Sequence, residues 1–178
     1  MGLVKAQDGV GLFVECFGEA NPEGASIVFS CAYSTTHANW LSQVEPLIEA
    51  GHRVALWDYR GHGQSETPAD LSALTMQQVV SDLGCVADIL SPDAPVVLAG
   101  LSFGGLASLH FTVAHPERVR ALVLAGSGPG FKKPEAAARW KAQYFKKNPA
   151  ADTNRDGKLS WPELQDHRKK AAQEKNKK

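Results

Sequence analysis

The sequence predicts an α/β fold with a mostly parallel β-sheet, followed by a smaller helical segment. Hydrophobic residues make up 43% of the 178 residues, enough for a sizeable core, which argues against global disorder. Short apolar runs alternate with stretches of helical periodicity, as in strand–helix–strand units. The charge balance changes sharply near Gly130, so we expect two domains, 1–130 and 131–178.

Net charge is zero overall, but it is unevenly distributed. Residues 1–130 hold 5 basic and 13 acidic residues, whereas residues 131–178 hold 14 and 6. The three cysteines show no CxxC spacing, which favours a reducing compartment without a disulfide framework. No signal peptide and no apolar run near 18 residues is visible, so we expect a cytoplasmic protein without a membrane span.

Five apolar runs are expected to form strands. The first alternates in polarity and the others are continuous, as in strands that are buried on both faces. Three stretches between them repeat apolar residues at helical spacing, and Ser72 or Thr75 could start the second. The expected strands are 11–18, 25–31, 53–58, 94–100 and 119–126, and the expected helices are 37–51, 74–90 and 103–115.

Past residue 130 the sequence changes character. Residues 134–147 favour a helix, residues 148–164 contain turn-forming residues, and residues 165–178 read as a basic helix that frays at its end. The terminal lysines are interpreted as a solvated tail, so no nucleic-acid partner is expected.

A G-x-S-x-G sequence lies where the strand 94–100 meets the helix 103–115. Gly100-Leu101-Ser102-Phe103-Gly104 therefore has the strand–turn–helix context of a nucleophile elbow, a sharp turn that strains the serine. The flanking glycines are expected to avoid collisions with nearby backbone. The following helix N-terminus would stabilise developing negative charge.

Two further motifs extend this pattern into a family resemblance. Residues 57–68 read WDYRGHGQSETP, similar to a D-x-R-G-x-G-x-S segment, and residues 115–130 read HPERVRALVLAGSGPG. With the elbow, residues 1–130 resemble the N-terminal half of the α/β-hydrolase superfamily. The resemblance implies an α/β-hydrolase-like sheet lacking its last strands. It also implies a serine hydrolase of the esterase or lipase kind, because dehalogenases and epoxide hydrolases normally carry Asp where Ser102 stands.

The same resemblance implies an oxyanion hole built from backbone N–H groups. The family usually has His-Gly-x after its third strand, whereas this chain has Cys31-Ala32-Tyr33. Alignment on Trp40 gives the N–H groups of Tyr33 and Phe103 as donors; a shift of one residue gives Ala32 instead. Backbone donors do not depend on a particular side chain.

The acid and the histidine that should follow Ser102 in a catalytic triad are not found. Their strands, the seventh and eighth of the family, are not visible, so whether the chain is an active enzyme stays open. His37 is considered as a stand-in base. His62, His110 and His115 are interpreted as structural or solvent-facing, and His167 could reach the site only by an unusual fold-back. The sixth strand would become an exposed edge. A truncated chain, coverage by 134–178, or pairing of two copies or with a partner would each account for this.

A calcium-type EF-hand loop is predicted at 152–163. The stretch matches D-x-[DN]-x-[DN]-G-x5-E, with Gly157 at the sharp turn and flanking helices at 134–147 and 161–173. The predicted structural or regulatory Ca²⁺ ligands are Asp152, Asn154, Asp156, Lys158 through its carbonyl, Ser160 and Glu163.

Two functions therefore stand side by side. The first is a hydrolase of small-molecule ester-type substrates through Ser102, with calcium bound at the loop. The alternative is a catalytically inactive calcium-binding or interaction module on a truncated hydrolase scaffold. Fold analogy alone names no substrate.

Overall fold

The computed structural model describes residues 2–128, 142–157, 163 and 167. By its contacts the chain divides into two compact units, Met1–Gly130 and Phe131–Lys178. The strands of the first unit are β1 (Gly2–Lys5), β2 (Gly11–Phe17), β3 (Ser26–Ser30), β4 (Arg53–Trp57), β5 (Val96–Leu101) and β6 (Val119–Ala125). Its helices are α1 (Leu41–Glu49), α2 (Met76–Leu90) and α3 (Phe103–Ala114), with 3₁₀ turns at His37–Trp40, Leu71–Ala73 and Pro116–Arg118.

The six strands form one mixed sheet in the order β1-β2-β4-β3-β5-β6. The pairs β4–β3, β3–β5 and β5–β6 are parallel, which confirms the predicted parallel core. β1 and β2 add an antiparallel margin. The sequence analysis missed β1, because its four residues are mostly exposed and show no continuous apolar run.

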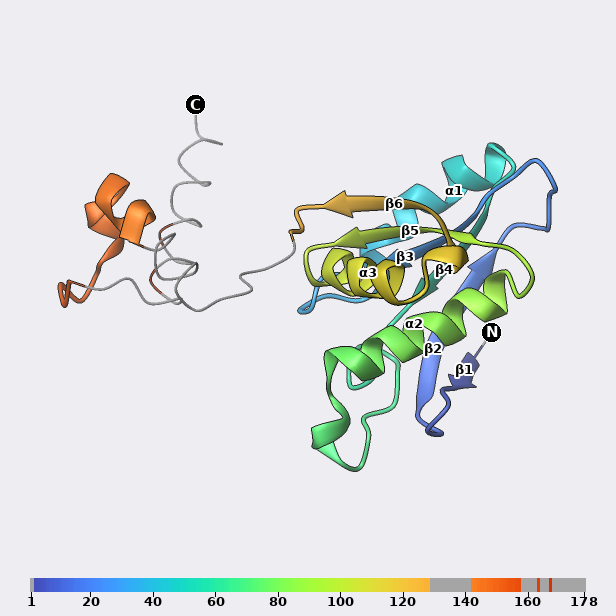
Figure 1. Ribbon diagram of the computed structural model, residues 1–178, viewed down its shortest axis with the longest axis horizontal. Helices are drawn as coiled ribbons and strands as arrows, with labels where there is room; N and C mark the ends of the chain where they lie inside the picture. Colours follow the sequence, from blue (N-terminus) through green and yellow to red (C-terminus); the bar gives the residue numbers. More distant parts are fainter. Residues whose placement is uncertain (1, 129–141, 158–162, 164–166, 168–178) are drawn as a thin grey trace. The chain divides into compact units, whose positions relative to one another are not determined.

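Helices cover both faces of the sheet, with α2 and α3 on one face and α1 on the other (Figure 1). Alternate residues of β3 point to opposite faces of the sheet. Val28 belongs to the core under α2 and α3. Ile27 and Phe29 belong to the core under α1. The central strands β3, β4 and β5 are buried on both faces, and their sequences are therefore continuous apolar runs.

The structure refines two predicted helices, at the start of α2 and in the segment 37–51 before β4. The Thr75 hydroxyl accepts a hydrogen bond from the Gln78 N–H at 3.2 Å and caps α2, which decides between the two predicted start residues. Ser72 instead lies in a 3₁₀ turn capped by Asp70. The stretch predicted as one helix, 37–51, divides into a 3₁₀ turn and α1.

β6 is the outer strand at one side of the described sheet, as the sequence predicted. It pairs with β5, and Val123 and Leu124 on it are 53% and 41% exposed. In the second unit, residues 142–147 are helical and Pro149–Ala151 form a 3₁₀ turn, with Ala151 buried against Tyr144 and Phe145. Among the described helices, none combines the length and apolar character needed to cross a bilayer.

Candidate active site

Ser102 occupies a strained turn between β5 and α3. Its φ is 53° and its ψ is −110°, in a region that non-glycine residues rarely adopt. The turn is fixed from the neighbouring strand, since the Ser102 N–H donates to the Ala125 carbonyl at 2.9 Å and the Ser127 hydroxyl lies 2.8 Å from the Ser102 carbonyl oxygen. The side chain is exposed at the N-terminus of α3, where a nucleophile could meet a substrate.

Glycines allow the elbow to pack against its surroundings. A Cβ at Gly100 would collide with the backbone of Gly104, and a Cβ at Gly104 would collide with the carbonyl oxygens of Ser30 and Cys31. The end of β3 therefore lies directly against the first turn of α3. This close approach gives a structural reason for the glycines that the motif requires.

Two aromatic side chains from the end of β4 hold the end of β3 in place. The Trp57 indole donates to the Ser30 hydroxyl at 3.0 Å, and the Tyr59 hydroxyl donates to the Cys31 carbonyl at 2.7 Å. Both aromatic side chains are fully buried, and burial raises the pKa of the Tyr59 phenol. The loop that continues from Cys31 is consequently anchored where it leaves the sheet.

The structure brings together the two residues predicted to form the oxyanion hole. The rings of Tyr33 and Phe103 are 5.3 Å apart between centroids in an edge-to-face arrangement. Phe103 is the first residue of α3, so its N–H is one of the groups that a helix cannot satisfy internally. The role of these two N–H groups as oxyanion donors remains a prediction.

Replacing Tyr59 with phenylalanine is expected to lower the free energy of unfolding by about 1–3 kcal/mol. The ring would stay in place, but the buried Cys31 carbonyl would lose its donor. Urea denaturation followed by circular dichroism would measure the loss. Tyr33→Phe serves as the control because Tyr33 is 60% exposed, and equal stabilities of the two variants would contradict the anchoring role.

His37, considered in the sequence analysis as a stand-in base, contacts carboxylates rather than Ser102. Its Nδ1 lies 2.9 Å from Asp58 Oδ2, its backbone N–H donates to Asp58 Oδ1 at 2.7 Å, and its Nε2 lies 3.8 Å from Glu15 Oε2. Both ring nitrogens thus face carboxylates. Among the described residues no hydrogen bond joins Ser102 Oγ to a histidine, so neither the base nor its acid is identified there.

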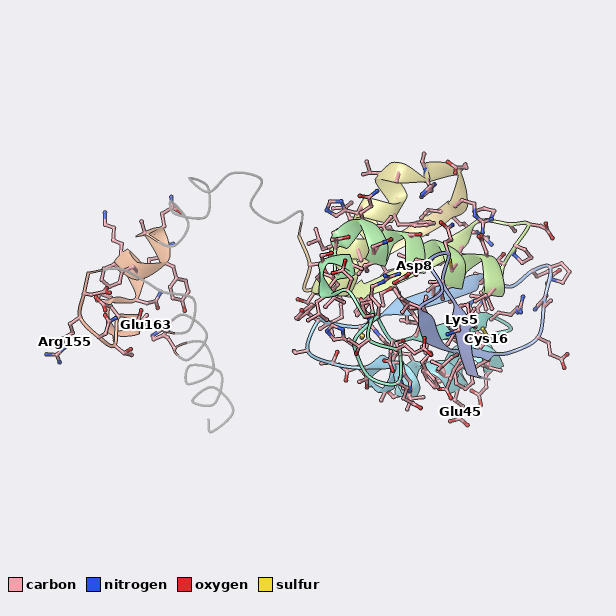
Figure 2. The ribbon with its side chains drawn as sticks, turned by 90° about the horizontal axis from the view of Figure 1, so that it is seen from below. Lys5, Asp8, Cys16, Glu45, Arg155 and Glu163 are labelled. Carbon is pink, nitrogen blue, oxygen red and sulfur yellow. The ribbon has the colours of Figure 1, made fainter. Side chains whose placement is uncertain are left out.

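A buried ion cluster, which the sequence analysis did not identify, supports the loop after β4. The Arg60 guanidinium binds Asp82 Oδ1 at 2.6 Å and Asp8 Oδ2 at 2.7 Å. Arg60 and Asp82 are 1% and 0% exposed, while Asp8 (labelled in Figure 2) is more accessible. Arg60 is the arginine of the WDYRGHGQS segment, so a buried arginine in that motif was the signal that could have pointed to partners on α2.

Comparison with known proteins agrees with this geometry. The family model for the alpha/beta hydrolase fold matches residues 21–167, most of the chain. The chain belongs to the α/β-hydrolase family. The chain is 41% identical over 103 residues to a 2-hydroxy-6-oxononadienedioate/2-hydroxy-6-oxononatrienedioate hydrolase of Escherichia coli K12, a match that covers 54% of the chain and 33% of that relative.

Solved structures of the family share the same architecture. An esterase from Exiguobacterium antarcticum superimposes with a TM-score of 0.67 at 27% identity, over 84% of this chain and 57% of the esterase. An epoxide hydrolase mutant from Vigna radiata gives 0.67 at 26% identity, over 75% and 40%. The chain thus spans about a third of the length of the curated relatives it matches and about half of these structures.

Cys31 lies beside the elbow but is not available as a nucleophile at neutral pH. The side chain is 1% exposed, and burial, with a smaller contribution from Asp58, raises the pKa of its thiol to about 11. The thiol therefore stays protonated, and Ser102 is the nucleophile candidate at this end of β5.

The predicted calcium loop is only partly described. Asp152 Oδ2 accepts the Gly157 N–H at 2.9 Å, Asn154 Oδ1 accepts the Asp156 N–H at 2.9 Å, and Gly157 has a φ of +77°. Glu163 Oε1 accepts from the Thr153 and Asn154 N–H groups at 3.1 and 3.2 Å. Predicted ligands Lys158 and Ser160 lie outside the described residues.

The described part of the loop does not by itself show a metal site. Across the described residues, no group of three or more His, Cys, Asp or Glu side chains is placed to hold a metal ion. In Figure 2 the Arg155 side chain points outward from the loop, whereas Glu163 lies within it. The EF-hand prediction is accordingly not shown by the structure.

Proposed function

We propose that this chain contributes the nucleophile and oxyanion site of a serine hydrolase that acts on ester-type bonds of small molecules. The observation that carries the proposal is the strained, exposed Ser102 between β5 and α3, packed through Gly104 against the anchored end of β3. The esterase of similar fold supports this class of reaction, and the Escherichia coli relative, whose named substrate contains no ester bond, supports hydrolysis in general.

The chemistry follows from the elbow. Ser102 Oγ would attack the ester carbonyl carbon and form an acyl-enzyme while the alcohol leaves, and water would later release the acid. Charge developing on the carbonyl oxygen would be stabilised by the N–H groups of Tyr33 and Phe103. The Ser102 proton must pass to a base and from it to the leaving alcohol. The described residues do not provide that base at hydrogen-bond distance, so we expect slow turnover from them alone.

The test compares residues 1–178 with Ser102→Ala on p-nitrophenyl acetate. We expect the unmodified chain to release p-nitrophenol at least about tenfold faster than the variant, because both proteins keep the oxyanion site but only the unmodified chain carries the Ser102 hydroxyl that can attack this activated ester. Mass spectrometry should find an acetyl group on Ser102. A matched Ser127→Ala variant controls for loss of a nearby hydroxyl that holds the turn but has no proposed chemical role.

Equal rates for the unmodified chain and Ser102→Ala, with a folded circular-dichroism spectrum, would contradict the hydrolase proposal for this chain. The alternative, a catalytically inactive calcium-binding or interaction module, would then account better for a folded sheet without Ser102-dependent activity and for the acidic loop.

We also propose that the loop 152–163 binds calcium in a structural or regulatory role. Support comes from the donor set: carboxylate and amide oxygens at loop positions 1, 3, 5 and 12, which are the hard ligands that Ca²⁺ prefers. The described half already turns around Asp152 and encloses the buried Glu163 carboxylate. Glu163 would have to exchange its contacts with the Thr153 and Asn154 amides for the ion.

Titration calorimetry with calcium on the metal-stripped chain tests this second proposal. We expect saturable binding that Glu163→Gln weakens on the order of tenfold or more, since it removes one of the few ligand charges. Glu117→Gln, an exposed acid in the other unit, is the matched control. Absence of heat with calcium, or equal affinity in Glu163→Gln, would overturn it.

A further inference from the structure

A small pocket adjoins the elbow through Phe103, the residue that follows Ser102. Its volume is about 110 Å³, and it lies between the loops after β3 and β4 and the start of α2. Most of its wall is aromatic or aliphatic. It is lined by Tyr33, Tyr59, Arg60, His62, Leu74, Thr75, Met76, Val79 and Phe103.

Four rings form a closed set of edge-to-face contacts at one side of this pocket. The Tyr33 ring lies 5.3 Å from Phe103 and 4.8 Å from His62 between centroids. The Tyr59 ring lies 5.3 Å from Phe103 and 5.9 Å from His62. Rings that contact one another in this way leave no space for a cation among them, so the cluster is a rigid apolar wall rather than a cage.

Most polar atoms of the pocket lining already form hydrogen bonds or ion pairs with other groups of the protein. The Tyr59 hydroxyl donates to the Cys31 carbonyl, the Thr75 hydroxyl caps α2, and the Arg60 guanidinium is bound by two carboxylates. His62 Nδ1 lies 3.1 Å from the Arg60 carbonyl oxygen. Among the described lining residues, therefore, no lysine and no unpaired arginine is present to bind a carboxylate group of a substrate.

We propose that this pocket holds a short, uncharged alkyl chain on the acyl side of an ester, with butyryl as the preferred group. The proposal rests on the hydrolase function above and names its substrate class. Because a water-sized group takes about 30 Å³, a volume of this size accommodates roughly four non-hydrogen atoms. Longer or charged acyl chains would leave atoms in solvent or bury a charge without a partner.

The proposed preference differs from the substrate in the name of the Escherichia coli relative, a dicarboxylate. A dicarboxylate would need a cationic group for its distal carboxylate, and the Arg60 side chain in this pocket is already paired on both sides. The lining of this chain thus favours hydrocarbon over a second acid group.

Leu74 offers a way to fill the pocket without disturbing the core. It lines the pocket but is 43% exposed, and Leu71, in the preceding 3₁₀ turn, is 64% exposed and does not line it. Hydrolysis of p-nitrophenyl acetate, butyrate and octanoate would be compared in the unmodified chain, Leu74→Trp and the matched control Leu71→Trp. We expect butyrate to be preferred, and the butyrate-to-acetate ratio of kcat/KM to fall about tenfold in Leu74→Trp only. An unchanged ratio in Leu74→Trp, or a preference for octanoate, would overturn the pocket assignment.

A binding measurement separates this proposal from the catalytic one. Nuclear magnetic resonance of Ser102→Ala, which has no nucleophile, would follow the ring signals of Tyr33 and Phe103 during titration with butyramide or butyrate. We expect butyramide to shift them saturably, butyrate to shift them far less, and Leu74→Trp in the same background to abolish the effect. If the ester assay shows no Ser102-dependent rate but butyramide still binds in this way, the pocket stands and the hydrolase proposal fails. If butyramide leaves the rings unshifted, the pocket proposal is wrong whatever the rate.

Discussion

Replacing Arg60 with methionine is expected to lower the free energy of unfolding by about 3–5 kcal/mol, because it leaves a buried carboxylate without its partner. Asp82 is 0% exposed, and the guanidinium is its ion-pair partner at 2.6 Å. Methionine preserves much of the aliphatic volume, so the loss reports the charge. Urea denaturation of the two proteins at neutral pH measures it.

The pH dependence of this loss follows from the direction of the Asp82 pKa. Burial already raises that pKa, and hydrogen bonds and attraction from Arg60 oppose the rise. Without Arg60 the folded-state pKa should rise further above the unfolded value, so the carboxyl is protonated more readily in the fold. The stability deficit should therefore shrink as the pH falls from neutral to mildly acidic and grow as the pH rises.

Two further variants test whether the loss in Arg60→Met comes from the buried charge of Asp82 rather than from the loss of any ion pair. Lys5→Met breaks the exposed pair between Lys5 and Glu66 and should cost much less stability than Arg60→Met. The double variant Arg60→Met with Asp82→Leu removes both buried charges and should recover a large part of the lost stability. If the single Arg60 variant is as stable as Lys5→Met, the cluster does not hold the loop after β4.

Gly104→Ala is expected to lower the free energy of unfolding by about 1–3 kcal/mol, even though alanine is the better helix former. The added Cβ would fall on the carbonyl oxygens of Ser30 and Cys31, which are backbone atoms that cannot rotate away. Relief requires the end of β3 to move from α3. We therefore also expect any Ser102-dependent esterase rate to fall, because the loop bearing Tyr33 follows this end.

Gly84→Ala is the matched control, since Gly84 also lies inside a helix. There the new Cβ would meet only a ring carbon of Phe111 at 3.4 Å, an ordinary contact. That variant should be neutral or up to about 1 kcal/mol more stable. Urea denaturation of both variants gives the comparison, and similar effects in Gly84→Ala and Gly104→Ala would argue against the close approach at the elbow.

The elbow could be predicted from the sequence because its determinants are local. A serine between two glycines, after a continuous apolar strand and before a helix, allows few other conformations, and Ser102 has the strained φ that this context implies. The strands β2 to β6 could be predicted for a related reason, because each has a continuous or alternating apolar run. In β3, β4 and β5 that run reflects burial on both faces, whereas β6 is an exposed outer strand. β1 has neither feature, and it is a strand because the edge of β2 pairs with it.

The roles of individual polar side chains depended on residues far away in the chain. His37 could have been a base by its position near the oxyanion loop, yet its nitrogens face Asp58 and Glu15. Asp58 directly follows β4 and Glu15 lies within β2, and periodicity carries no information about which side chains of separate strands meet. The calcium loop differs from His37, because its ligands are predicted from the spacing of residues within one short segment. The described residues do not show a metal site there, so calcium titration is the measurement that tests this prediction.

The sequence by itself determined the α/β class, the membership of Ser102 in an elbow and the change of character near residue 130, because these depend on residue type and short-range spacing. Only the tertiary structure decided that Arg60 is clamped by Asp8 and Asp82, and that four rings close a small pocket beside Phe103. Such arrangements join segments that are about 20 to 70 residues apart in the chain, and they arise from the packing of strands and helices rather than from any local preference.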